Sequence, residues 1–175
     1  NAIDLDNATG LITATAITAL TGDASDVQTA LASSGITTVT NDSLAVTVSG
    51  SVSVSDINTI NSDSATGVVT ATASETGAAT LTGLTTTSTD EISITMGSSS
   101  TAASDLNTID SKTATAINAT AITALTGDAS DVQTALASSG ITTVTNDSLA
   151  VTVSGSVSVS DINTINSDSA TGVVT

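Results

Sequence analysis

The chain has 175 residues, of which 17 are acidic and only one, Lys112, is basic, so the formal net charge is −16. This charge excludes an ordinary nucleic-acid-binding protein, because lysine and arginine neutralise phosphates, and it argues against docking on anionic lipid. The sequence contains no histidine, cysteine, proline or aromatic residue, so acid–base, thiol and zinc chemistry lack their usual side chains and we expect no enzyme.

The apolar residues indicate the kind of core. Thick cores draw on aromatic rings, whereas this chain offers only small and aliphatic side chains, which favours the thin core of a solenoid. Charged residues make up 10% of the chain, unlike the highly charged composition of disordered proteins; disorder remains the alternative. No run of 18 apolar residues occurs, so we expect no membrane insertion.

A long segment of the sequence is duplicated. Residues 14–70 return unchanged as residues 119–175, an offset of 105 (119 − 14). Repeat arrays have this property, because each unit needs only its neighbours to bury its apolar face. We therefore interpret 1–175 as one window of an array, with 14–118 as one full repeat and 119–175 as the start of the next.

Two short motifs alternate along the array, and both ends of the window fall inside a motif, so we expect the array to continue beyond it. Asn-x-Ile-Asp/Asn recurs at residues 1–4, 58–61, 107–110 and 163–166, and Leu-Thr-Gly at residues 20–22, 81–83 and 125–127.

The first predicted strand lies near residues 12–16. Ile12, Ala14 and Ala16 alternate with Thr13 and Thr15, which is the period of a strand with one face inward. The same alternation returns at residues 67–73 and 116–121.

A short helix is predicted over residues 22–31. Asp23 is placed to cap its start, and Asp26 lies in the first turn, where negative charge is favoured. Gly35 is expected to stop it. Two further helical segments have inward apolar residues: 55–61 with Ile57 and Ile60, and 102–110 with Leu106 and Ile109.

A second strand type begins at residues 44–48, where Leu44, Val46 and Val48 point to one side. Its relatives are residues 92–96, in which Met96 fills a valine position in the core, and residues 149–153. Residues 36–40 are ambiguous between a short strand and a connection.

These elements predict the architecture. Strand centres fall near residues 13, 46, 70, 94, 118 and 151, at spacings of 24 or 33. We expect a β-rich, right-handed solenoid of six stacked parallel strands with short helices between them, an α/β solenoid. The helices at Asp23 and Asp128 are interpreted as insertions in the two longer spacings. The alternative is an all-β right-handed β-helix, since the Ser- and Thr-rich linkers are weak helix formers.

Acidic residues recur at fixed positions and raise the possibility of calcium, which binds six to eight oxygen ligands. The candidate ligands are Asp23, Asp26, Asp42, Asp128, Asp131 and Asp147. The alternative is that these aspartates cap helices and form turns, because neither an EF-hand loop nor a Gly-Gly-x-Gly-x-Asp nonapeptide occurs. No other cofactor is expected.

Outward-facing threonines are a second candidate surface, either for a ligand such as ice or simply as solvent-facing strand residues. The candidates are Thr13, Thr15, Thr70, Thr72 and Thr120. We expect Thr13 and Thr70 in one ladder with Asn118 and Thr175, and Thr15, Thr72 and Thr120 in the neighbouring ladder.

The repeated segments resemble a known type of array. Leu-Thr-Gly-Asp-Ala-Ser-Asp-Val (20–27), Gly-Ile-Thr-Thr-Val (35–39), Ser-Asp-Ile-Asn-Thr-Ile (55–60) and Thr-Gly-Val-Val-Thr-Ala-Thr (66–72) are similar to the Thr/Ala/Asp-rich tandem repeats of very large secreted surface proteins of marine bacteria, including cyanobacteria. The resemblance implies an extracellular setting and a structural or adhesive role.

We therefore expect a structural protein, a segment of an extracellular filament or cell-surface stalk. It would associate end to end with itself or continue in a longer chain. The alternative is an adhesin or ice-binding module that uses the outward threonines.

Overall fold

The computed structural model describes residues 10–38, 43–63, 65–144, 147–168 and 170–175. It is an α/β protein in which parallel strands are separated by short helices. The helices are α2 (Ala24–Ala32), α3 (Val54–Asn61), α4 (Ala78–Leu81), α5 (Ala103–Asp110), α6 (Ala129–Ala137) and α7 (Val159–Asn166). The strands are β1 (Ile12–Thr13), β2 (Ala19–Gly22), β3 (Ile36–Thr37), β4 (Leu44–Val52), β5 (Thr66–Ala73), β6 (Glu91–Ser93), β7 (Ser100–Ala102), β8 (Ile117–Asn118), β9 (Ala124–Asp128), β10 (Ile141–Thr142), β11 (Leu149–Ser154) and β12 (Thr171–Val174).

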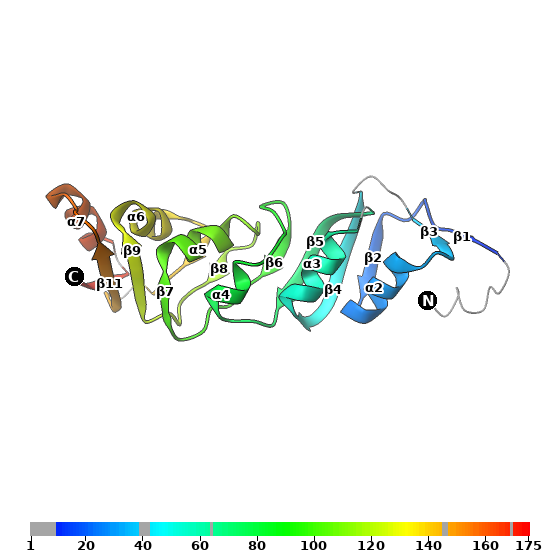
Figure 1. Cartoon of the computed structure of the whole chain (residues 1–175), viewed down its shortest axis with the longest axis horizontal. Helices are drawn as coiled ribbons and strands as arrows, with labels where there is room; N and C mark the ends of the chain where they lie inside the picture. The colour runs from blue at the N-terminus through cyan, green and yellow to red at the C-terminus, as the bar shows by residue number, and fades with distance from the viewer. Residues whose placement is uncertain (1–9, 39–42, 64, 145–146, 169) are drawn as a thin grey trace.

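The helices follow one another in chain order along the long axis of the molecule, from α2 near the end that holds β1 to α7 at the other end (Figure 1). Among the described residues, the strands form two four-stranded sheets, in the orders β2-β4-β5-β6 and β12-β11-β9-β7, and two two-stranded sheets, β1-β3 and β10-β8. Paired residues lie from 21 positions apart (Thr72 and Ser93) to 26 positions apart (Ala19 and Ala45). Two paired strands are therefore separated in the sequence by one helix.

The predicted strand spacing was wrong in one respect. Ile12 and Thr13 pair with Ile36 and Thr37 of β3, so the ambiguous segment 36–40 contains a strand. Leu20, in the unpredicted strand β2, pairs with Val46 of β4. The helix that begins after Asp23 therefore lies within a spacing of 24 residues (36 − 12). It is an ordinary part of the fold and not an insertion.

The helices confirm much of the sequence analysis and contradict the all-β alternative. Helices α3 and α5 fall within about a residue of their predicted bounds. Helix α2 starts after Asp23 as predicted, but it ends at Ala32 with Ser33 as its cap in extended conformation. Gly35 is therefore not its stop signal.

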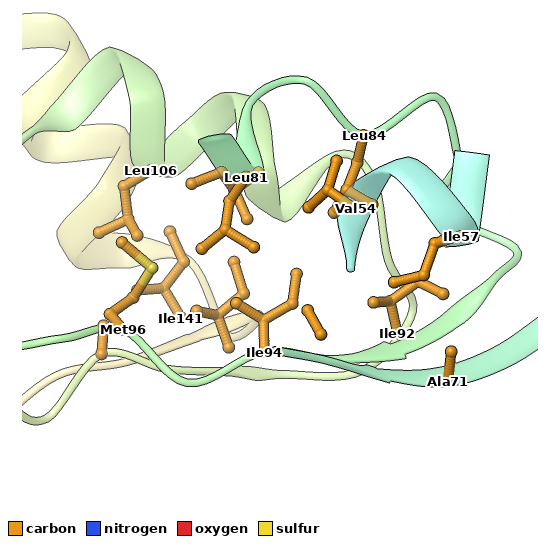
Figure 2. Packing of buried hydrophobic residues seen from close by; sticks show 14 of the residues in the cluster. Val54, Ile57, Ala71, Leu81, Leu84, Ile92, Ile94, Met96, Leu106 and Ile141 are labelled. Carbon is orange, nitrogen blue, oxygen red and sulfur yellow. The ribbon is translucent and has the colours of Figure 1, made fainter. Parts of the chain in front are cut away.

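The core is a layer of aliphatic side chains between the strands and the helices (Figure 2). Leu44, Val46 and Val48 of β4 are buried, whereas Ala45 and Thr47 are exposed, which confirms the predicted alternation. On the helix side Ile57, Ile60, Leu106 and Ile109 are completely buried. Each such side chain contributes about 1.5–3 kcal/mol when it leaves water. Met96, at 1% exposure, is also core, as predicted.

The alternation predicted for residues 12–16 and 116–121 extends too far. Ala16 and Ala121 are exposed, because the chain turns just before them. The turns are closed by hydrogen bonds from the Ile17 amide to the Ala14 carbonyl and from the Ile122 amide to the Ala119 carbonyl, both 3.2 Å long.

Candidate functional site

Two of the calcium candidates, Asp23 and Asp128, begin helices. An oxygen of the Asp23 carboxylate accepts hydrogen bonds from the Asp26 amide and the Ser25 hydroxyl, both at 2.9 Å. Asp128 makes the same two bonds, at 3.0 Å, with Asp131 and Ser130. These backbone bonds first, and the serine hydroxyls next, lower the pKa of both aspartates below the ordinary value of 3.8.

The other calcium candidates do not gather around these two. Asp26 and Asp131 lie in the first turns of α2 and α6. Asp147 is exposed in a left-handed backbone conformation, with φ of 52°, and Asp42 lies outside the described residues. In the part of the chain that the structure describes, no group of three or more acidic side chains is placed to hold a metal ion. The arrangement fits helix capping, and calcium binding stays a prediction, which melting with and without a chelator would test.

The threonine candidates do not form the expected ladders. Thr13 pairs with Thr37 in the sheet of β1 and β3, whereas Thr70 pairs with Thr47 and Glu91 in another sheet. Thr72 lies between Ser51 and Ser93. Thr15 and Thr120 lie in the turns that follow β1 and β8. The expected grouping fails because β2 and β3 were not counted as strands.

A different row of threonines runs across the strands. Thr21, Thr47 and Thr70 are consecutive partners on β2, β4 and β5, and the row ends at Glu91, whose carboxylate accepts a 3.1 Å hydrogen bond from the Thr70 hydroxyl. In the second copy the same row comprises Thr126, Thr152 and Thr175. The hydroxyls of Thr152 and Thr175 lie 3.1 Å apart.

Sequence reasoning missed a polar link between successive helices. The side-chain amide of Gln28 on α2 donates to the Asp56 carboxylate on α3 at 3.0 Å, and Gln133 on α6 does the same to Asp161 on α7 at 3.2 Å. The Ser53 hydroxyl, with Gln28 second, lowers the pKa of Asp56. Ser158 and Gln133 act in the same order on the pKa of Asp161. The serine caps Ser53 and Ser158 were not predicted either, and no pattern in the sequence indicates that a glutamine 28 residues away contacts each aspartate.

Asp90 is a second residue that sequence reasoning missed. It is 3% exposed, and its carboxylate accepts hydrogen bonds from the amides of Val69 at 2.9 Å and Thr87 at 2.8 Å. A buried carboxylate needs such donors to offset its lost hydration. Asp90 thus joins β5 to the loop before β6 and has a structural role.

Comparison with known protein families, with curated protein sequences and with solved structures found no match. Among the described residues, no helix combines the length and the apolar character that crossing a bilayer requires.

Proposed function

We propose that the chain is a stretch of a solenoid that serves as a structural segment of an extracellular filament or cell-surface stalk. The observation that carries the proposal is the strand pairing. Partners 21–26 residues apart (93 − 72 and 45 − 19) are what successive windings of one chain produce, and the helices advance in chain order along one axis (Figure 1).

The duplicated sequence supports the same proposal. Helices α2 and α6 are identical in sequence, have nine residues each and share the same aspartate cap. Windings that fold alike can be added without changing the fold of those already present. A chain of this architecture can therefore be lengthened by adding windings, which suits a role that depends on length.

The strongly acidic composition favours a structural role over the binding of ordinary partners. A net charge of −16 keeps long parallel surfaces apart and soluble. We propose that the only partners the array requires are further windings, either in the same chain or in another copy joined end to end. We also propose that the array serves as a structural segment at the cell surface.

Electron microscopy of the native assembly tests the function. Four windings per 105-residue repeat, at about 4.8 Å per strand, give an axial rise of roughly 19 Å on the strand side. Filaments with that period on the cell surface would support the proposal. Intracellular or purely globular particles would contradict it.

The row of Thr21, Thr47 and Thr70 favours a second candidate, an adhesin or ice-binding module, because regularly spaced hydroxyls on a flat strand face can order water. Thermal hysteresis measured on the intact chain, and on a Thr47→Ala/Thr70→Ala variant as its matched control, tests this candidate. Activity that disappears in the variant would support ice binding. Equal thermal hysteresis of the intact chain and the variant would contradict ice binding by this row of threonines and would favour the filament segment.

A further inference from the structure

Identical residues in the two copies differ greatly in exposure. Val54 is 6% exposed, whereas Val159, which begins the sequence-identical helix α7, is 78% exposed. Because residues 44–70 and 149–175 have the same sequence, the difference comes from what packs against them. The first copy thus displays the natural cover of a face that the second copy leaves open.

The cover of Val54 comes from residues 71–93. The Glu75 carboxylate accepts the hydrogen bond of the Val54 amide, at 3.1 and 3.2 Å to its two oxygens. Leu81 and Leu84 are 0% and 2% exposed, and Leu84 lies beside Val54 in the core (Figure 2). The Glu75 carboxylate and the Leu84 side chain therefore cover the start of α3.

The same segment also binds the middle of α3 and the edge of β5. The Asn58 side chain donates to the Gly83 carbonyl and accepts from the Thr85 amide, both at 2.8 Å. Next to it, β6 pairs with β5, and Ala71 lies opposite Ile92. Side chains, loop backbone and strand edge together make this contact specific to the sequence of residues 71–93.

The corresponding groups of the second copy are open. Asn163, the counterpart of Asn58, is exposed. Val153, Ile162 and Val174 are half-buried, although their counterparts are buried. We call these three residues with Val159 the open face.

We propose that the open face is a docking face for a segment with the chemistry of residues 71–93. Such a segment supplies a carboxylate to the Val159 amide, an aliphatic side chain like that of Leu84 to the apolar surface, and a carbonyl and an amide to Asn163. This inference goes beyond the filament role, because it states which segment stacks on which. Segments like 71–118 must follow segments like 14–70, so the face sets the order of the array.

A lengthened chain tests the proposal. A second copy of residues 71–118 is joined after Thr175, and amide hydrogen exchange is followed over residues 159–166. We expect exchange of the Val159 amide to slow by roughly tenfold or more relative to the chain of 175 residues, since burying one valine and its neighbours is worth at least that factor.

Two substitutions at exposed valines provide matched variants. Val159→Asp in the lengthened chain should abolish the added protection. Val173→Asp should leave it intact, because Val173 is 67% exposed and its counterpart Val68 stays 40% exposed in the covered copy. Both side chains are on the surface of the chain of 175 residues, so neither substitution should prevent folding.

Three results would overturn the proposal. The first is a lengthened chain whose Val159 amide exchanges as fast as before. The second is protection that survives Val159→Asp. The third is concentration-dependent protection of the unlengthened chain by itself, measured with sedimentation in parallel, because the occupant would then be the other end of a second copy.

Discussion

Asp23 and Asp128 show how a single side chain fixes the start of a helix in this fold. Each carboxylate accepts the amide of the residue three positions on, at 2.9 and 3.0 Å. A residue in the extended conformation with a short acceptor side chain is the preferred start of a helix. This role accounts for two of the acidic positions without a metal ion.

The two aspartate caps predict how the stability of the fold depends on pH. The pKa of Asp23 and Asp128 is lower in the folded chain than the ordinary 3.8, so their ionised form favours the fold. The contribution is complete above pH 3.8 and is lost as the pH falls through the lower, folded-state pKa. Urea midpoints of the natural chain and of Asp23→Ala/Asp128→Ala should therefore differ at neutral pH and converge in acid.

The double variant also serves as the reference for the general charge effect. Protonation of the many other carboxylates relieves repulsion in both proteins. This effect therefore cancels when the urea midpoint of one protein is subtracted from that of the other. A gap between the midpoints that stays constant down to pH 2 would contradict the capping account.

Val54 and Val159 form a natural pair for a stability test. Val54→Ala removes two buried methyl groups, since Val54 is 6% exposed, and should lower the free energy of unfolding by roughly 1–3 kcal/mol. Val159→Ala, at a site that is 78% exposed, should change it by less than about 0.5 kcal/mol. Denaturant unfolding measures both, and equal losses would show that the two copies are packed alike.

At the scale of elements, local signals predicted helices α2, α3 and α5 and the longest strands, but they missed helix α4. Leu44, Val46 and Val48 alternate with exposed residues in strand β4, and Asp23, three residues before Asp26, marks a helix start. These patterns depend only on neighbours in sequence, so they can be recognised without the fold. The predicted cap Asp23 was part of the same success.

What could not be predicted depends on contacts between distant residues. Strands β1 and β3 have two residues each, too few to show a period, and only their mutual pairing makes them strands. Leu-Thr-Gly lies within strand β2 at residues 20–22 but at the end of helix α4 at residues 81–83. The threonine ladders were misassigned for the same reason, because ladder membership follows from strand order.

Contacts between α3 and the following loop yield a prediction at this scale. Asn58→Ala removes three hydrogen bonds, two of 2.8 Å with the Gly83 carbonyl and the Thr85 amide and one of 3.1 Å from the Thr85 hydroxyl. It should lower the free energy of unfolding by about 1–2 kcal/mol. Asn163→Ala makes the identical change at an exposed site and should cost less than about 0.5 kcal/mol. Thermal unfolding of the two variants side by side provides the measurement, and a larger effect at Asn163 would refute the assignment.

At the scale of the whole molecule, composition and architecture agree. A chain without aromatic residues has a core of small and aliphatic side chains, and these lie in a layer between the strands and the helices. The sheets and the row of helices advance along one axis (Figure 1). The proposed filament segment uses this property directly, and the acidic surface limits sideways association.

Small-angle X-ray scattering of a length series tests the central claim most directly. The series comprises the natural chain and chains lengthened by one and two further 105-residue repeats (119 − 14). Stacked windings predict a constant cross-sectional radius and a maximum dimension that grows by an equal step, of at least roughly 19 Å, with each repeat. A radius of gyration that instead rises with chain length to about the power 0.38, as in compact globules, would contradict the account.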